Sequence, residues 1–195
     1  NQARGSMRPG ACARRWDSGT RTPMRLLFLI PSLSGGGAER QMSLIAPEMV
    51  RRGHEVHVCC VSRESDTQPL VTAGVDVCRL QSRTAYDPRL LLRLKRIMAK
   101  IKPDLVQTWL VPMDILGGLA ATMGRVPWVL REPTNRDGHP EVVRNLLRRA
   151  VAASAAAVIA NSQGGIAYWE TQPFPGQRFL VTNAVPLAEI ERTER

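Results

Sequence analysis

The stretch that decides the fold is residues 24–61, MRLLFLIPSLSGGGAERQMSLIAPEMVRRGHEVHVCCV. An apolar run over 25–30 predicts a strand, and a glycine-rich turn follows it. Apolar residues then recur at helical spacing over 38–52, until Gly53 supplies a stop signal. A second strand is expected over 55–61. This strand–helix–strand order is typical of a parallel βαβ unit.

The same alternation continues along the rest of the chain. Further strands are expected over 75–80, 104–109, 126–130, 156–160 and 178–181, and further helices over 88–102, 113–123, 140–153 and 165–171. The pattern predicts an α/β fold: a Rossmann-like, doubly wound parallel sheet with helices on both faces. Ligands bind beyond the carboxyl ends of the strands in such sheets. The expected site is therefore formed by the loops 31–38, 62–66, 109–113 and 131–139.

Composition excludes several classes of protein. Of 195 residues, 44% are hydrophobic and 23% are charged, which is unlike a disordered, collagen-like or coiled-coil chain. The longest nearly unbroken apolar run, 150–160, is shorter than the roughly 20 residues that span a bilayer. The cysteines form no CxxC pair. His57 and Cys59 are two residues apart on an expected strand and so share a face, but packing in the core explains this pair better than metal binding does. We therefore expect reduced thiols and no metal.

Charge is unevenly distributed along the chain. Residues 1–23 carry five arginines and show no hydrophobic period, so we expect a basic, disordered head or a cloning remnant. One domain is expected over 24–184. The formal net charge of +10 favours anionic partners.

Ser34, Gly35, Gly36 and Gly37 lie between the first expected strand and the first expected helix. Glycines let a ligand approach the backbone, and the free N–H groups of a helix start favour phosphate. These four residues are therefore the candidate phosphate site for a donor, and a tight turn without a ligand is the alternative. The sequence contains neither GxxxxGKS/T nor, at this turn, GxGxxG, which argues against a nucleoside-triphosphate loop and against hydride transfer.

Residues 24–61 resemble the opening of family-4-type glycosyltransferases of the two-domain GT-B fold, above all in PSLSGGGAER at 31–40. The stretches 102–135, 155–169 and 179–185 resemble later parts of the same family in the same order. The resemblance implies the N-terminal, acceptor-side domain of an enzyme that transfers a sugar from a nucleotide sugar. It also implies retention of configuration and the absence of a metal or other cofactor.

In that family a second, C-terminal domain holds most of the donor. The resemblance makes residues 185–195 the start of the linker to that domain, so the chain alone is expected to be inactive. A stand-alone α/β ligand-binding module without catalysis is the alternative.

The family's histidine after the fifth strand is absent, because this segment reads LREPTN at 130–135. Glu132 is the remaining candidate catalytic residue, as the acceptor of a hydrogen bond from a substrate hydroxyl, and Arg131 is a candidate ligand of an anionic group. Trp109, at a strand end, and Asn135 complete the candidate acceptor site with these two residues. Packing of Trp109 in the core and a surface turn capped by Asn135 are the structural alternatives.

Two expected amphipathic helices are rich in basic residues, from Arg89 to Lys102 and from Arg144 to Arg149. Their basic faces either lie on an anionic membrane surface or are simply exposed to solvent on packed helices. Few aromatic residues, 5%, argue against nucleic acid as a partner. The expected partners are a nucleotide sugar and a sugar or lipid-linked acceptor. The expected location is the cytoplasm, peripheral to the inner face of the cell membrane, in polysaccharide or glycolipid assembly.

Overall fold

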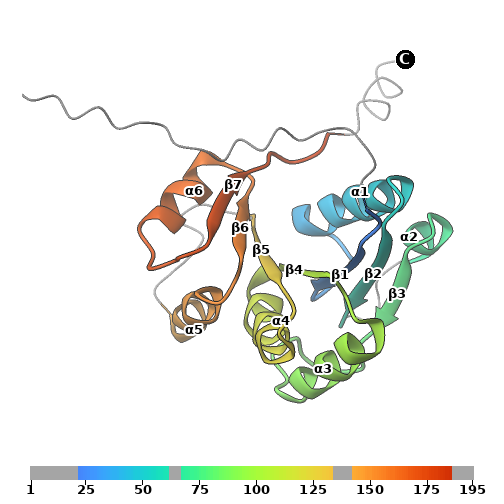
Figure 1. The fold of residues 1–195 in the computed structure, drawn as a ribbon, viewed down its shortest axis with the longest axis horizontal. Helices are drawn as coiled ribbons and strands as arrows, with labels where there is room; N and C mark the ends of the chain where they lie inside the picture. The colour runs from blue at the N-terminus through green and yellow to red at the C-terminus, as the bar shows by residue number, and fades with distance from the viewer. Residues whose placement is uncertain (1–21, 62–66, 134–141, 186–195) are drawn as a thin grey trace, which may run out of the picture.

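The computed structural model of the protein describes residues 22–61, 67–133 and 142–185. Within these residues the centre is a seven-stranded sheet in the order β3-β2-β1-β4-β5-β6-β7 (Figure 1). The strands are β1 (Arg25–Ile30), β2 (Glu55–Cys60), β3 (Asp76–Arg79), β4 (Leu105–Trp109), β5 (Trp128–Glu132), β6 (Ala157–Ala160) and β7 (Gln177–Leu180). Every neighbouring pair is parallel, so the predicted Rossmann-like, doubly wound sheet is confirmed.

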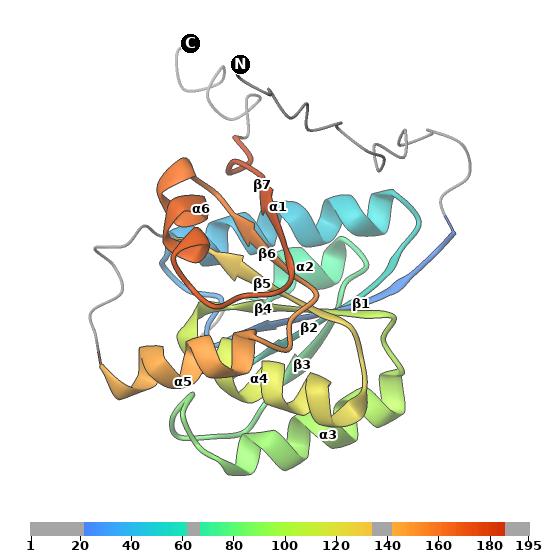
Figure 2. The same ribbon diagram turned by 60° about the vertical axis from the view of Figure 1, so that its left-hand side comes forward.

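Helices cover both faces of the sheet, as Figures 1 and 2 show. One face carries α1 (Gly37–Arg51) and α2 (Gln68–Thr72), the other carries α3 (Arg89–Ile101), α4 (Leu110–Gly124) and α5 (Val143–Ala152), and α6 (Gln163–Glu170) packs beside β6 and β7. Because side chains alternate along a strand, each face has its own apolar core. Phe28 of β1 shares a core cluster with Met42 of α1, whereas Leu29 shares one with Leu94 and Met113.

Two boundaries at the carboxyl edge of the sheet differ from the expected ones. β5 runs over Trp128–Glu132 rather than 126–130, because the pairs of Trp109 with Arg131 and of Glu132 with Ala160 continue the ladder. Arg131 and Glu132 are therefore strand residues and not loop residues. α4 begins at Leu110, directly after β4, and Leu110 takes a left-handed φ of 66° to make the turn. For a residue with a side chain this is a strained conformation.

Candidate functional site

The carboxyl ends of β1, β4, β5, β6 and β7 meet around a cavity of about 360 Å³. The residues that line it follow these strands or belong to the start of α1: Gly36, Gly37, Ala38, Glu39, Gln41, Trp109, Leu110, Arg131, Pro133, Asn161 and Asn183. Doubly wound sheets bind their ligands at this edge. Three of the four expected site loops, 31–38, 109–113 and 131–139, contribute to the cavity, and 62–66 lies outside the described residues.

The glycine-rich turn forms one wall of this cavity. Gly35 has a φ of 87°, which favours glycine, and Gly36 is the N-cap of α1 without a side-chain hydrogen bond. The N–H of Arg40 donates to the carbonyl of Gly36, and the N–H groups before it have no acceptor inside the helix. A side chain on Gly37 would meet no atom within 4 Å. The turn is therefore open and suited to presenting N–H groups to an anion.

The same turn also borders a second cavity, of about 370 Å³, on the side of α2. Ser34 lines neither cavity, and its hydroxyl is hydrogen-bonded to that of Ser32 at 2.8 Å. Glu39, which belongs to the PSLSGGGAER stretch but was given no role there, lines both, and its carboxylate lies where a side chain of Gly36 would be. A carboxylate in the first turn of a helix interacts favourably with the macrodipole. An anionic ligand must therefore share this helix start with Glu39.

Arg131 and Trp109, both candidates for the acceptor site, lie together at the cavity. Nη2 of Arg131 donates to Oδ1 of Asn183 at 3.0 Å, and its guanidinium carbon lies 5.7 Å from the centroid of the Trp109 ring. Both side chains are buried, with 2% and 1% of their surface exposed. Burial lowers the pKa of Arg131 from its ordinary value. The cavity thus contains a largely desolvated cation against an indole ring, and the contact of either residue with an acceptor stays a prediction.

The segment after β7 closes one side of the cavity. Nε2 of Gln41 donates to the carbonyl of Ala184 at 2.9 Å, and the N–H of Ala184 donates to Oε1 of Gln41 at 2.7 Å. The neighbouring Asn183 accepts the hydrogen bond from Arg131. Gln41, Asn161 and Asn183 were not expected at the site. Gln41 and its partner Ala184 are 143 positions apart, so the sequence around Gln41 does not indicate that the two residues meet.

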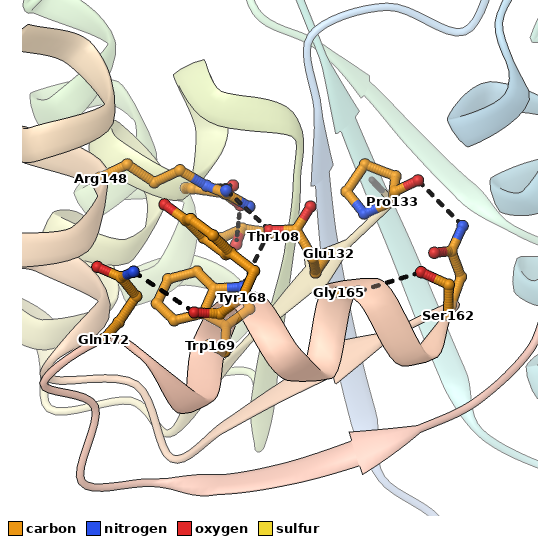
Figure 3. A network of polar contacts seen from close by, with 11 residues as sticks. Thr108, Glu132, Pro133, Arg148, Ser162, Gly165, Tyr168, Trp169 and Gln172 are labelled. Atoms are coloured by element: carbon orange, nitrogen blue, oxygen red, sulfur yellow. Dashed lines mark hydrogen bonds and ion pairs between the residues drawn. The ribbon is translucent and has the colours of Figure 1, made fainter. Parts of the chain in front are cut away.

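Glu132 does not line the cavity, although it directly follows Arg131. Successive residues of a strand point to opposite faces, and Glu132 is turned toward α5 and α6. Its Oε2 accepts from Nη1 of Arg148 and from Nε1 of Trp169, both at 2.9 Å (Figure 3). The candidate catalytic carboxylate is therefore held in a fully buried polar cluster, away from the cavity. Asn135, the remaining candidate, lies outside the described residues.

Asp114 and Thr108 complete this polar cluster. Nε of Arg148 donates to Oδ2 of Asp114 at 2.6 Å, and the hydroxyl of Thr108 donates to Oδ1 of Asp114, also at 2.6 Å. Burial raises the pKa of Asp114 to about 6, against the opposing effect of Arg148. Burial alone would lower the pKa of Arg148, but the charges of Asp114 and Glu132 outweigh it and raise the pKa. One guanidinium thus contacts two buried carboxylates.

The basic surface of α5 is smaller than the sequence predicts. Arg148 is only 1% exposed, which corrects its place in the basic surface expected from Arg144 to Arg149. Arg144 is exposed beside the exposed apolar side chains of Val143, Leu146 and Leu147.

In the described part of the chain, no helix has both the length and the apolar character that a membrane crossing requires. The same residues contain no group of three or more histidine, cysteine, aspartate or glutamate side chains placed to hold a metal ion.

Comparisons with known proteins agree on the fold. Similar solved structures are HepE of Anabaena in complex with UDP-glucose (19% identity, TM-score 0.65, 88% of this chain and 50% of that one), MurG of Acinetobacter baumannii (17%, 0.58, 84% and 47%) and sucrose-phosphate synthase of Thermosynechococcus elongatus (14%, 0.69, 85% and 49%). This chain spans about half the length of each. No match was found among curated protein sequences.

The family is shown by a sequence profile rather than by these structures. The profile of Glycosyltransferase Family 4 matches residues 35–189, which is most of the chain and includes the glycine turn and the segment after β7. The resemblance seen in the sequence is thereby confirmed: the chain belongs to Glycosyltransferase Family 4.

Proposed function

We propose that this chain is the acceptor-side, N-terminal domain of a glycosyltransferase that uses a nucleotide sugar, needs no metal ion and retains the configuration of the transferred sugar. Membership of Glycosyltransferase Family 4 supports sugar transfer. The observation that carries the proposal is the convergence of helix-start N–H groups and the Arg131 guanidinium on one cavity at the carboxyl edge.

The groups around this cavity suit the parts of a nucleotide sugar. The N–H groups at the start of α1 and the cation of Arg131 suit phosphate oxygens. The side-chain amides of Asn161 and Asn183 suit sugar hydroxyls, because each amide offers both donors and an acceptor. HepE, which has the same fold over half its length, was solved with UDP-glucose. A UDP-sugar is therefore the first donor to test.

We propose that a second domain supplies the rest of the donor site, since this chain spans about half of HepE, MurG and sucrose-phosphate synthase. The chain alone then binds ligand weakly and transfers no sugar. Sugar transfer by the isolated 195-residue chain would contradict this part of the proposal.

A change at Gly37 in the full-length parent protein tests the role of the cavity. Gly37→Glu places a carboxylate in open space at the helix start, where it competes with phosphate, whereas Gly37→Ala adds only a methyl group there. We expect the KM for the UDP-sugar to rise at least about tenfold with glutamate and to stay within about twofold with alanine. Absence of transfer from every nucleotide sugar tried would contradict the proposed function, and UDP binding without transfer would favour the stand-alone module instead.

We also propose that the domain docks on an anionic membrane surface, at the inner face of the cell membrane, where a lipid-linked acceptor of glycolipid or polysaccharide assembly is held. Support comes from α5, on which Val143 is 74% exposed, Leu146 60% and Leu147 50%, beside Arg144. Amphipathic helices of this kind insert their apolar side chains among lipid headgroups.

Sedimentation with phosphatidylglycerol vesicles over a salt series tests this docking. We expect binding at low salt that weakens as salt rises, because the charges are screened. Leu146→Ser should weaken it, whereas Val71→Ser should not, since Val71 is 49% exposed but lies on α2. Lack of binding at the lowest salt would contradict the docking proposal and would leave sugar transfer untouched.

A further inference from the structure

A second cluster of reactive side chains lies at the β3 edge of the sheet, outside the site described above. A cavity of about 330 Å³ opens there between β3 and α3, and its lining includes Cys78, Arg79, Leu80, Arg93, Arg96 and Ile97. Cys78 is half-buried, so its sulfur is partly shielded from water and still reachable. None of these residues lines the cavity at the carboxyl edge.

Cys78 has a second thiol as its direct neighbour. Cys59 of β2 and Cys78 of β3 are register partners on adjacent parallel strands, and both pack on the face that α3 covers. Adjacent strands lie about 4.8 Å apart, which is within the roughly 4.4–6.8 Å that separates the Cα atoms of a disulfide. Because register partners on adjacent strands point to the same face of the sheet, the two thiols are direct neighbours there. The two sulfurs are therefore placed to form a bond without a large movement of either strand.

The two thiols differ in reactivity. The neighbouring Cys59 thiol lowers the pKa of Cys78, and the charge of Lys100 lowers it further. The neighbouring Cys78 thiol raises the pKa of Cys59, and burial adds to this rise. Because the thiolate is the nucleophile in thiol chemistry, Cys78 is the attacking group of the pair. Cys59 is fully buried whereas Cys78 is half-buried, so a reagent in the cavity reaches the sulfur of Cys78 first.

Positive charge surrounds the cavity that contains Cys78. Arg93 and Arg96 are exposed on α3, and within the described residues neither forms an ion pair. Arg79 lies on β3 and donates from Nη2 to Oγ1 of Thr67 at 3.0 Å. A guanidinium presents a fork of donors that matches a carboxylate. A thiol reagent that carries carboxylates is therefore favoured at Cys78 over a neutral one.

We propose that Cys78 is a modification site for carboxylate-bearing, low-molecular-weight disulfides, and that Cys59 resolves the adduct. The Cys78 thiolate attacks one sulfur of the reagent, a mixed disulfide forms, and the other half of the reagent leaves as a thiolate. The sulfur of Cys59 then attacks the sulfur of Cys78, and the second half of the reagent leaves with the proton of Cys59 as a thiol. In sum, two protein thiols are oxidised to one disulfide, and one reagent disulfide is reduced to two thiols.

Peptide mass spectrometry of the reduced chain after reaction with glutathione disulfide tests this sequence of steps. Tryptic cleavage after Arg52, Arg63 and Arg79 puts Cys59 and Cys78 on different peptides, so an internal disulfide joins the two. We expect these joined peptides from the wild type, a lasting glutathione adduct on Cys78 in Cys59→Ser, and neither product in Cys78→Ser. Cys60→Ser is the control and should still give the joined peptides, because Cys60 packs in the other core.

A comparison of two reagents tests the arginines. The double change Arg93→Gln and Arg96→Gln alters exposed positions only, so it should leave the fold intact. We expect the rate with glutathione disulfide to fall at least about fivefold, and the rate with neutral hydroxyethyl disulfide to stay within about twofold. An equal loss with both reagents, or first modification at Cys12 or Cys60, overturns the proposal. An adduct on Cys78 that persists while Cys59 is present overturns the resolving step.

Discussion

Replacing Arg148 with methionine removes the guanidinium that lies between Asp114 and Glu132 and keeps a long side chain in its place. Two hydrogen bonds to carboxylates are lost, at 2.6 and 2.9 Å. A hydrogen bond to a charged group contributes about 1.5–3 kcal/mol, and removal of one partner from a buried ion pair costs about 3–5 kcal/mol. Neither carboxylate has exposed surface that water could solvate. We therefore expect Arg148→Met to lower the free energy of unfolding by about 4 kcal/mol.

Urea unfolding followed by far-ultraviolet circular dichroism measures this loss as a lower midpoint at an unchanged slope. Arg144→Met is the matched control, since Arg144 lies one turn earlier on α5 with an exposed side chain, and we expect a change of at most about 0.5 kcal/mol. Arg148→Lys keeps a positive charge and should give an intermediate loss that is measurable if the methionine variant does not fold. A loss below about 1 kcal/mol for Arg148→Met would refute the reasoning.

The pH dependence of this loss has a definite sign. Burial raises the pKa of Asp114 from 3.8 to about 6, so the folded state binds the proton more tightly than the unfolded state. The free energy of unfolding therefore falls as the pH rises through this interval. Without Arg148 the ionised form of Asp114 loses an attractive charge, and the pKa rises further. We expect the deficit of Arg148→Met against the wild type to be smaller at pH 5 than at pH 7, and an equal deficit at both pH values would contradict this account.

Two further predictions concern the wall of the cavity. Gly35→Ala puts a side chain at a φ of 87° and should lower the free energy of unfolding by about 1–2 kcal/mol. The added methyl group of Gly37→Ala meets no atom within 4 Å, so the midpoint of thermal unfolding should stay close to that of the wild type. Gln41→Leu removes both hydrogen bonds to Ala184, so hydrogen exchange of the Ala184 amide should become at least about fivefold faster. An unchanged exchange rate would show that the two hydrogen bonds do not hold the segment after β7 in place.

Hydrophobic periodicity is sufficient to predict the sheet of this chain, because a parallel strand that is buried on both faces appears as a short apolar run. RLLFLI at Arg25–Ile30 is such a run and forms β1. α2 was not expected, since its five residues are too few to show a helical period and Pro69 lies in its first turn. β5 was placed two residues early because Arg131 and Glu132, its last residues, are of types that are seldom buried.

Buried charge is the part of the structure that periodicity does not predict. Arg148 shares an amphipathic helix with Arg144 and Arg149, and spacing alone grouped all three on one basic surface. The available signal lay on other elements: Asp114 in the apolar helix α4 and Glu132 at the end of an apolar strand. A carboxylate that stays ionised in such surroundings requires a cation as its partner. Which arginine serves depends on how α4 and α5 pack, and this is a property of the tertiary structure.

The polar cluster and the cavity are connected through one strand end. Arg131 and Glu132 are adjacent on β5 and point to opposite faces. Hydrogen bonds from Arg148 and Trp169 hold the side chain of Glu132. They therefore also fix the strand backbone from which Arg131 reaches Asn183. Apolar side chains of similar volume often stabilise a fold as well as a buried ion pair does, so stability alone does not explain these charges. Directional bonds from α5 and α6 supply what apolar packing lacks, namely a fixed orientation of the strand end. A cation that contacts phosphate depends on such support, because small displacements weaken a directional contact. We therefore propose that Glu132 supports the candidate site by holding Arg131 in place, from the face of the sheet opposite the cavity.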